Sequence, residues 1–372
     1  MKSAIVIGAG IVGMATARAL AEKGYAVKVF ERNEKCVGAS IRNFGMVWPI
    51  GQPKGTLYER AMRARAIWRQ SCTEGNIWHN EVGSLLNVYE EDELRVIEEF
   101  AELNKDYREV AILTPEQTVA KSAATNPKGL KASLWSPTEI IVDPREAIWK
   151  LPAYLGNKYG IEFHFNKAVT RIEHPKVHTG KEVHEADLIF VCSGADFETL
   201  YPETFTASGI TKCKLQMLRT VPQDDNWQIG PALCGGLTLT HYGAFAECKS
   251  LAALNERVER TMPDYVKWGI HVMISQNGLS EITIGDSHEY GLVHDPFDRD
   301  DINQLIMHYL HKFSNVQDLE IAQTWNGTYA KLKGKTEFVA TPESGVTIIN
   351  GLSGAGMTLS FGLAEEVVNA TV

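Results

Sequence analysis

The sequence lacks three features that mark large classes of proteins: a long apolar run, an excess of positive charge and paired cysteines. No apolar run approaches the ~20 residues that a helix needs to cross a bilayer. The 372 residues include 37 lysines and arginines against 46 acidic residues, a formal net charge of −9. A nucleic-acid-binding protein would show a basic patch or stripe instead. We therefore expect a globular protein with no membrane span and no nucleic-acid partner.

The six cysteines are scattered, without a C-x-x-C pair or the spacing of metal ligands. We expect them to be reduced thiols in a cytoplasmic protein, and we expect no metal site. No internal repeat or low-complexity tract is visible, and the chain is long enough for two domains. The cysteines are Cys36, Cys72, Cys192, Cys213, Cys234 and Cys248.

The chain opens on a strand, a glycine-rich turn, a helix and a second strand. Residues 4–7 form a short apolar run, typical of a buried parallel strand. The turn reads Gly8-Ala9-Gly10-Ile11-Val12-Gly13, and the second strand, residues 26–30, ends on Glu31. Such a turn alone is weak evidence, and a secretory segment behind Lys2 is the alternative. The order of all four elements favours a dinucleotide site.

Each part of this pattern has a physical role in binding a dinucleotide. Gly8 permits the tight turn, Gly10 lets the backbone approach a pyrophosphate, and Gly13 lets the helix pack closely on the strand. The helix N-terminus offers backbone amides and the positive end of the helix dipole. Glu31 lies about 20 residues after the loop, where an acid accepts hydrogen bonds from a ribose.

Two further stretches follow in the first part of the chain. Residues 38–45 are polar and punctuated by glycine, and Arg42 and Asn43 beside two glycines favour ligand contact over a plain surface loop. Residues 57–69 are predicted to be helical. Their arginines are more typical of a solvated face than of a ligand site.

Later segments return to the nucleotide-binding layer after two excursions. Residues 187–192 read as a buried strand ending on Ser193-Gly194, where an α/β sheet meets its ligand. A strand at 345–352, the turn Gly354-Ala355-Gly356 and a closing helix mirror the opening pattern. The second excursion, from about residue 214 to 323, is expected to be mostly β, with strands at 237–242 and 281–290 and a helix at 300–313.

In their order along the chain, these motifs resemble the D-amino-acid oxidase and glycine/sarcosine oxidase superfamily of FAD-dependent amine oxidoreductases. The resemblance also uses the helix start Asp143-Pro144-Arg145 and the closing segment Gly351 to Thr358. It implies an α/β fold with a Rossmann-like FAD-binding domain and a mixed β-sheet substrate domain. The implied FAD-binding segments are 1–80, 143–212 and 325–372, and the implied substrate-domain segments are 81–142 and 213–324.

The resemblance further implies a non-covalent FAD. The opening turn would hold the pyrophosphate, Glu31 the ribose, Val169 the adenine, and the closing turn the flavin pyrimidine edge, where negative charge develops on reduction. The full implied set of cofactor residues is Gly8, Gly10, Ile11, Val12, Gly13, Glu31, Arg32, Ser40, Arg42, Asn43, Val169, Ser193, Gly194, Gly354, Ala355, Gly356, Met357 and Thr358.

The sequence departs from the family pattern at three positions. Tyr329 stands about where amino-acid-oxidising members carry an arginine that grips the substrate carboxylate. Thr358 stands where monomeric sarcosine oxidases have a lysine, and Thr283 where they have the lysine that activates oxygen. No cysteine lies near Tyr329 along the sequence, which argues against covalent flavin attachment there.

Three segments (residues 42–49, 239–245 and 285–291) resemble a clade of these enzymes that is associated with bacterial aminophosphonate breakdown. A tetrahedral phosphonate can be held by a lysine, histidines and tyrosine hydroxyls instead of an arginine. Each histidine or tyrosine taken singly is more often structural. The candidate substrate-binding and catalytic residues are His241, Tyr242, His288, Tyr290, Tyr329 and Lys331.

If residues 237–242 form a strand, only one of His241 and Tyr242 can face the flavin. Trp48 and Trp325 are candidate walls of a cage around a substrate ammonium, although core packing is the default for both.

The implied reaction is hydride transfer from the amine-bearing carbon to flavin N5, followed by imine hydrolysis, with O2 or another electron acceptor. The favoured substrate is 2-aminoethylphosphonate or its N-methyl form, giving phosphonoacetaldehyde and ammonia or methylamine. Three alternatives stay open at this point. They are a glycine/sarcosine-type oxidase with Lys331 or Arg42 replacing the arginine, a dehydrogenase using a carrier, and a flavin-binding subunit that is inactive without a partner.

Overall fold

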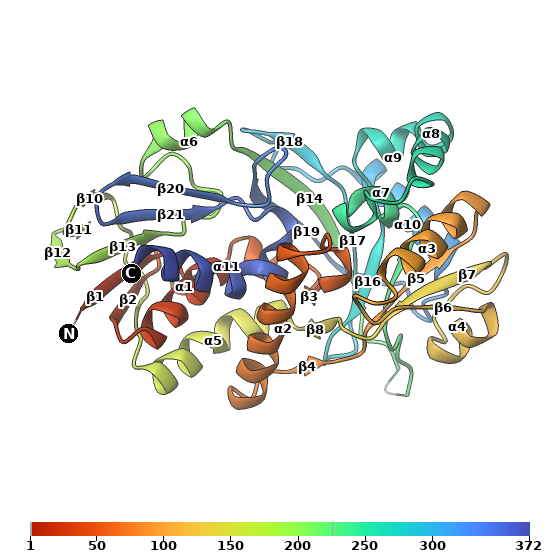
Figure 1. Ribbon diagram of the computed structural model, residues 1–372, viewed down its shortest axis with the longest axis horizontal. Helices are drawn as coiled ribbons and strands as arrows, with labels where there is room; N and C mark the ends of the chain where they lie inside the picture. The colour runs from red at the N-terminus through yellow and green to blue at the C-terminus, as the bar shows by residue number, and fades with distance from the viewer. Residues whose placement is uncertain (1, 225) are drawn as a thin grey trace.

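The computed structural model describes residues 2–224 and 226–372. Two sheet-based halves lie side by side, and both chain ends lie in the left-hand half (Figure 1). That half is built on a six-stranded sheet, parallel except for its β20–β21 pair. In spatial order its strands are β20 (Phe338–Glu343), β21 (Val346–Asn350), β13 (Leu188–Val191), β1 (Ser3–Ile7), β2 (Ala26–Phe30) and β9 (Glu162–His164).

Both faces of this sheet are buried, which explains the continuous apolar run of β1. Ala4 and Val6 belong to the hydrophobic cluster on one face of the sheet, and Ile5 and Ile7 belong to the hydrophobic cluster on the other face. The first face is covered by α1 (Ile11–Glu22), α2 (Thr56–Glu74), α5 (Pro144–Tyr159) and α11 (Gly356–Thr371). The second is covered by α6 (Pro202–Ser208) and a small sheet of β10 (Arg171–Glu173), β11 (Lys176–Thr179) and β12 (Glu182–Glu185).

The right-hand half is built on a nine-stranded mixed sheet (Figure 1). Its strands are β18 (Glu289–Gly291), β14 (Thr211–Thr220), β17 (Ile282–Gly285), β16 (Met273–Gln276), β15 (Ala232–Gly235), β5 (Ser84–Val88), β7 (Ala132–Ser136) and β6 (Ala111–Leu113), with β19 (Ile321–Lys331) paired to β14. A further small sheet contains β3 (Met46–Val47), β8 (Ile140–Val142) and β4 (His79–Asn80). The fold is thus the expected α/β arrangement of a Rossmann-like sheet and a mixed β-sheet.

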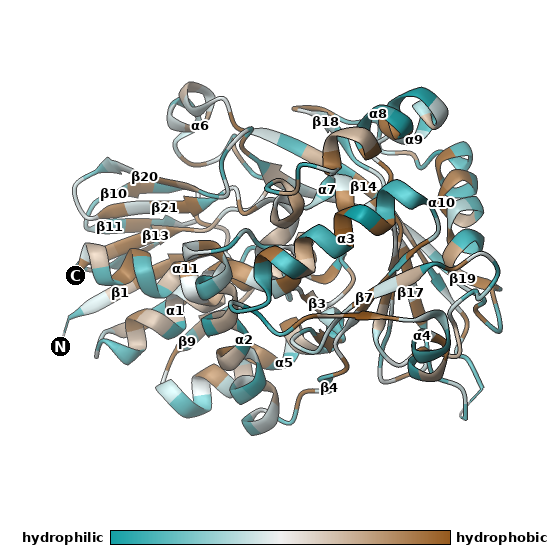
Figure 2. Ribbon diagram, turned by 45° about the vertical axis from the view of Figure 1, so that its right-hand side comes forward, coloured by the Kyte–Doolittle hydropathy of each residue, from teal (hydrophilic) through white to brown (hydrophobic). Residues whose placement is uncertain are grey.

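The helices of this half are α3 (Glu91–Asn104), α4 (Pro115–Lys121), α7 (Thr238–His241), α8 (Leu251–Thr261), α9 (Pro263–Lys267) and α10 (Asp300–Phe313). Short 3₁₀ turns occupy Ala39–Ile41, Pro49–Gly51, Gly243–Phe245 and Ser353–Ala355. Figure 2 shows hydrophobic residues along the strands, whereas the outer helix α8 is largely hydrophilic. Only Leu254 and Val258 of α8 are buried, as expected for a helix that covers one edge of a core.

The secondary structure of residues 237–242 differs from the expected one. These residues were expected to form a strand, but they contain the short helix α7. The Thr240 hydroxyl donates to the Leu237 carbonyl at 2.8 Å, and the Tyr309 hydroxyl accepts from the Leu237 amide at 2.9 Å. These tertiary and local bonds override the alternating pattern of the sequence. Helices α8 and α9 also lie in a stretch that was expected to be mostly β.

The five domain segments remain a prediction, and two of their boundaries fall inside strands. The boundary at 212/213 cuts β14, and the boundary at 324/325 cuts β19. The two strands pair with each other along their length in the nine-stranded sheet, so that sheet begins at Thr211 on β14 and extends to Lys331 on β19. Lys331 also forms an isolated bridge to Leu352.

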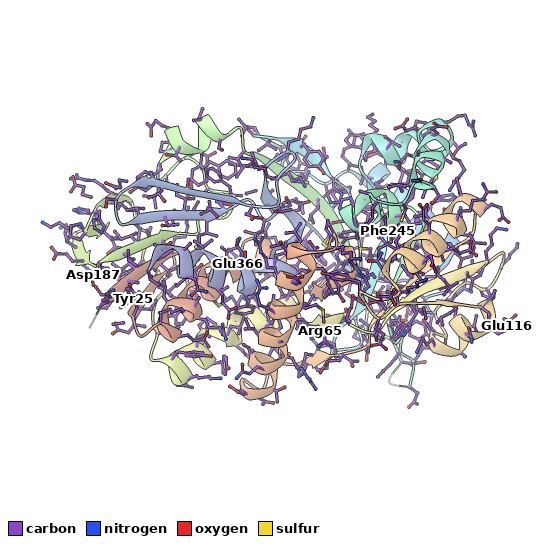
Figure 3. All side chains as sticks on the ribbon, in the orientation of Figure 1. Tyr25, Arg65, Glu116, Asp187, Phe245 and Glu366 are labelled. Atoms are coloured by element: carbon purple, nitrogen blue, oxygen red, sulfur yellow. The ribbon has the colours of Figure 1, made fainter. Side chains whose placement is uncertain are left out.

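The arginines of α2 are not a freely solvated face. Arg60 is 5% exposed and contacts Glu337 at 3.1 Å and Glu366 at 2.6 Å. Glu366 is labelled on α11 in Figure 3 and also pairs with Arg63. Arg65 contacts Glu81 at 2.7 Å. The basic run thus joins α2 to its neighbours, and none of these arginines lines the ligand cavity described below.

Candidate active site

The opening turn has the close contacts that require glycine. Gly8 has a φ of +103°, and a Cβ on it would lie 2.4 Å from the Cys192 carbonyl oxygen. A Cβ on Gly13 would lie 1.8 Å from the Gly8 carbonyl oxygen, so α1 can approach β1 only with glycine at this position. The turn therefore leaves the N-terminus of α1 open to the cavity at Gly10 and Ile11.

Glu31 is held rigidly at the end of β2. One carboxylate oxygen accepts from the Ala9 amide at 3.0 Å, and the other accepts from the Asn33 amide at 3.1 Å. The side chain lines the cavity and is largely buried. A carboxylate fixed in this way keeps its remaining lone pairs for a hydroxyl donor, as a ribose site requires.

The loop after β2 folds against the opening turn. The Ser40 hydroxyl accepts from the Ile11 amide at 3.0 Å, and the Asn43 amide group bonds only within its own loop. Arg42 donates to the carbonyls of Val37 at 2.9 Å and Asn326 at 3.0 Å. These side chains line the cavity, and their hydrogen bonds also shape its wall.

The closing turn forms the opposite side of the cavity. Gly354, Gly356 and Met357 all line it. The Thr358 hydroxyl points elsewhere, because it accepts from the Trp48 amide at 2.9 Å in the core. Thr358 and Gly13 are the two predicted cofactor residues that do not line the cavity.

One cavity of about 500 Å³ joins all these elements to the nine-stranded sheet. It extends from the opening turn, past the closing turn, to side chains of β14, β18 and β19. The predicted residues that it brings together are Gly8, Gly10, Ile11, Val12, Glu31, Arg32, Ser40, Arg42, Asn43, Val169, Ser193, Gly194, His241, Tyr242, His288, Tyr329, Lys331, Gly354, Ala355, Gly356 and Met357.

Tyr329 occupies the end of the cavity nearest the closing turn. A Cβ on Gly354 would lie 3.6 Å from the Tyr329 hydroxyl oxygen. Burial, with a smaller effect of the neighbouring Cys213, raises the pKa of this phenol well above its usual value. Tyr329 is therefore a neutral hydrogen-bond donor in the wall of the cavity.

The expectation that no cysteine lies near Tyr329 is wrong in space. Cys213 is its cross-strand partner in the β14–β19 pair, a neighbour that a scan along the chain could not reveal. Burial raises the pKa of the Cys213 thiol to about 12, and this side chain does not line the cavity. The thiol is protonated at neutral pH and is a poor nucleophile.

Lys331 is the cation at this end of the cavity. It is half-buried, and no carboxylate among residues 2–224 and 226–372 forms an ion pair with it.

Tyr242 and Tyr290 line the same region. Because α7 is a helix, His241 and Tyr242 both line the cavity, against the expectation that only one could do so.

Two polar residues of this region were missed by the sequence analysis. His271 and Asp286 line the cavity beside His241 and His288, and both are buried. Burial raises the pKa of Asp286 to about 6, so its carboxyl group is mostly ionised at pH 7. Asp286 lay in a segment already singled out, but no sequence signal connects it with His271, because the contact depends on the pairing of β16 with β17.

Comparison with known proteins identifies the family. Residues 3–370 match the family model described as FAD dependent oxidoreductase. The chain belongs to this family. FAD is therefore its cofactor, and the glycine turns, the fixed acid and the extended cavity fit that molecule. No curated protein matches the chain by sequence.

Solved structures of several enzymes share the fold. L-proline dehydrogenase from P. horikoshii is 22% identical, with a TM-score of 0.79 over 100% of this chain and 94% of that one. Glycine oxidase from Bacillus cereus ATCC 14579 is 16% identical, with a TM-score of 0.77 over 100% and 95%. L-alpha-glycerophosphate oxidase from Mycoplasma pneumoniae, solved with FAD bound, is 16% identical, with a TM-score of 0.74 over 100% and 95%.

In this FAD-dependent oxidoreductase, the two tryptophans expected to form a substrate cage lie outside the cavity. Trp48 is 5% exposed and packs in the core, and neither it nor Trp325 lines the cavity. Thr283 also faces away from the cavity, and its hydroxyl accepts from Arg219 at 3.3 Å. No helix in the described part of the chain is both long enough and apolar enough to span a membrane.

Proposed function

We propose that this enzyme oxidises a small amine that carries a phosphonate group, with 2-aminoethylphosphonate or its N-methyl form as the substrate. FAD supplies the two-electron acceptor for the oxidation of the amine-bearing carbon. Water then hydrolyses the imine to phosphonoacetaldehyde and releases ammonia or methylamine. The observation that carries the proposal is the presence of Tyr329 where the family resemblance implies a carboxylate-gripping arginine, close to Lys331, which has no carboxylate partner among the described residues.

The cavity end offers donors in an arrangement suited to a tetrahedral anion. Lys331 supplies a compact positive charge that can contact any of three oxygens, whereas an arginine fork matches a planar carboxylate. Tyr329 and Tyr290 supply neutral hydroxyl donors on the same side. The solved structure of glycerophosphate oxidase indicates that this fold accommodates a substrate with a tetrahedral anionic group.

The amine must lose its proton before it can be oxidised. Leu215 and Met217 line the same end of the cavity and are both buried. Apolar walls disfavour an ammonium through desolvation, so they shift a bound amine toward its neutral form. No side chain is needed as a dedicated base in this scheme.

We infer that the cofactor residues act as the resemblance implies. The backbone at Gly8 to Gly13 would hold the pyrophosphate, Glu31 the ribose, and the amides at Gly354 and Gly356 the pyrimidine edge. The attachment is proposed to be non-covalent. Cys213 lies outside the cavity, and burial raises the pKa of the two cysteines that line it, to about 11 for Cys36 and about 12 for Cys192, so both thiols are protonated.

A glycine/sarcosine-type activity is the second candidate, and L-proline dehydrogenase and glycine oxidase share the fold. In that case Lys331 or Arg42 would have to replace the arginine. Arg42 is a poor replacement, because two backbone carbonyls already occupy its guanidinium.

Steady-state assays with the purified holoenzyme separate the candidates. The panel is 2-aminoethylphosphonate, its N-methyl form, glycine, sarcosine and proline, each measured with O2 and with an artificial dye. We expect the highest kcat/KM for a phosphonate. Turnover of sarcosine or glycine without turnover of either phosphonate would refute the proposal. Turnover with dye alone would identify a dehydrogenase, and inactivity with every amine would identify a subunit that needs a partner.

A further inference from the structure

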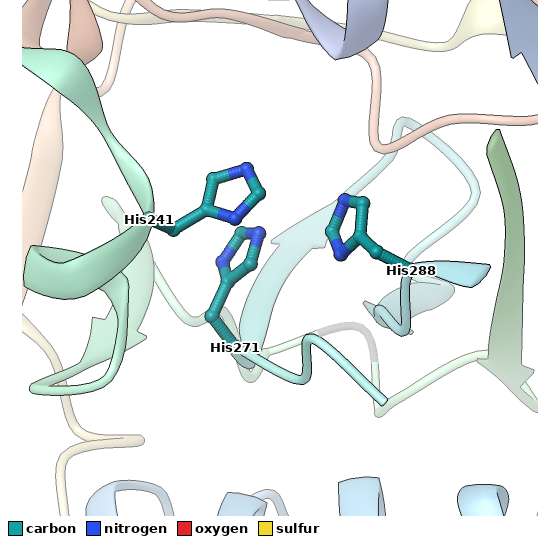
Figure 4. A group of neighbouring side chains, drawn as sticks. All are labelled: His241, His271 and His288. Carbon is teal, nitrogen blue, oxygen red and sulfur yellow. The ribbon is translucent and has the colours of Figure 1, made fainter. Parts of the chain in front are cut away.

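Three histidines from separate segments meet in the cavity wall. His241 ends α7, His271 precedes β16 and His288 precedes β18, and their rings face a common space in Figure 4. The ring centroids are 3.8 Å apart for His241 and His271, 4.7 Å for His241 and His288, and 5.3 Å for His271 and His288. One nitrogen from each ring lies within 4.8 Å of the others.

Two of these rings have a nitrogen available as a ligand. His288 Nδ1 lies 2.8 Å from the Gly269 carbonyl oxygen, so this nitrogen carries the proton and Nε2 presents its lone pair. His271 Nδ1 is buried and has no hydrogen-bond partner in the described chain. The His271 side chain is 4% exposed, so bulk water does not satisfy that nitrogen. His241 is exposed and lines the cavity.

The charge around the cluster favours a cation over an anion. Asp286 lies 3.3 Å from His271 Nε2 and 3.7 Å from His288 Nε2, and its Oδ1 has no hydrogen-bond partner in the described chain. The nearest other cation lining this end of the cavity is Lys331. A carboxyl group beside three imidazoles, with one oxygen left without a partner, suits a bound cation better than an anion.

We propose that His241, His271 and His288 bind one divalent transition-metal ion, with Zn²⁺ as the best match to three nitrogen donors. Asp286 compensates the charge of the ion and orients His271 from its Nε2 side, as carboxylates do behind metal-bound histidines, and the Gly269 carbonyl orients His288 in the same way. In a tetrahedral site with metal–nitrogen bonds of about 2.0 Å, the nitrogens are about 3.3 Å apart. His241 stands at the end of a four-residue helix, where its side chain can rotate inward.

Three protein ligands leave a coordination position open, and the cavity lies on that side. We infer that an anionic oxygen of the substrate takes this position. This second step rests on the proposed function, because the phosphonate supplies the oxygen. The ion would then complement Lys331 on the other side of the same tetrahedral group.

Metal binding is tested on the FAD-loaded enzyme after removal of metals with a chelator. Zn²⁺ and Co²⁺ are titrated separately, bound metal per FAD is measured by elemental analysis, and Co²⁺ absorption is followed beyond the long-wavelength edge of the flavin spectrum. We expect one ion per FAD and the intense absorption of a four-coordinate Co²⁺ site. His271→Ala and His288→Ala should weaken binding at least tenfold.

Controls keep this test independent of folding and of activity. His241→Ala changes a side chain exposed to the cavity, so it should retain fold and FAD while losing affinity for the metal at least tenfold. His311→Ala on the exposed face of α10 should bind the metal as the wild type does. Equal affinity in the wild type and His241→Ala, or no ion retained at micromolar concentration, would overturn the site.

The substrate step has its own readout. Methylphosphonate added to the Co²⁺ enzyme should change the Co²⁺ spectrum in the wild type, and an unchanged spectrum would overturn the coordination of an anionic oxygen. Metal binding without turnover of any phosphonate would refute the proposed function and leave the metal site standing. Turnover of a phosphonate with unchanged KM in the metal-free enzyme would refute the metal's role and leave the proposed function standing.

Discussion

Replacing Lys331 by methionine tests how the enzyme holds its substrate. Lys331 ends β19, lines the cavity and is anchored through its backbone bridge to Leu352. Methionine retains an unbranched stem of similar length and removes only the charge. Since no carboxylate pairs with Lys331 in the described chain, the substitution leaves no buried partner charge behind. The change should therefore affect ligand binding more than folding.

The magnitude follows from the kind of contact that is lost. A charge-assisted hydrogen bond at a partly buried site contributes about 1.5–3 kcal/mol. This corresponds to a decrease of about ten- to a hundredfold in kcat/KM. The decrease should be seen with N-methyl-2-aminoethylphosphonate, and it should arise mainly in KM. For a neutral secondary amine of the same length, kcat/KM should change by less than about threefold, because this amine carries no anionic group that could contact Lys331.

Matched variants make the result interpretable. Lys331→Arg keeps the positive charge and should recover most of the loss. Lys333→Met removes an exposed lysine two residues further on, outside the cavity, and should leave both substrates unaffected. Initial rates of dye reduction or O2 consumption measure all four enzymes. An equal loss on the charged and the neutral amine in Lys331→Met would refute the reasoning, because Lys331 would then support the flavin or the fold.

Three further predictions concern the cofactor and the fold. Acid precipitation should leave all flavin in the supernatant, since Cys213 lies outside the cavity and burial keeps the lining thiols of Cys36 and Cys192 protonated; flavin in the pellet would show a covalent bond. Glu31→Ala should raise the Kd for FAD by about ten- to a hundredfold, and an unchanged Kd in a titration of the apoprotein would show that Glu31 only braces the Ala9 amide. Arg60→Met should lower the free energy of unfolding by about 1–3 kcal/mol, because Glu337 and Glu366 lose a largely buried partner. Arg69→Met removes only the exposed ion pair with Glu81 and should lower the free energy of unfolding by less than about 1 kcal/mol. Equal effects of Arg60→Met and Arg69→Met in urea denaturation would contradict this ranking.

The sequence predicted the nucleotide-binding half well, because local constraints there coincide with the fold. The apolar run of β1 is buried on both faces, and the glycines meet backbone atoms at distances that exclude a Cβ. Asp143 caps α5 as expected, accepting from the Arg145 amide at 2.9 Å. The contact of Gly13 with Gly8 and the cap at Asp143 involve near neighbours in the chain, and the strand-turn-helix order makes the remaining contacts of the opening turn recognisable from the sequence.

The substrate end was less predictable, because its contacts arise between strands. Cys213 meets Tyr329 only through the register of β14 with β19. His271 meets Asp286 through the pairing of β16 with β17. No periodicity in the sequence encodes such cross-strand neighbours, and the alternating pattern at residues 237–242 even favoured the wrong element.

These two kinds of contact explain how the fold can keep its cofactor and change its substrate. The cofactor residues are tied to one another through backbone geometry, so a substitution such as Gly13→Ala would disturb β1 and α1 together. The substrate residues are side chains carried by separate strands of the second sheet, and each can be replaced without changing the path of the chain. Tyr329 illustrates this, since β19 keeps its full pairing with β14 although it carries a tyrosine where an arginine was expected. Under the proposed function, substrate choice depends on which groups β14, β18 and β19 present to the cavity, and the contrast between charged and neutral amines in Lys331→Met tests that dependence directly.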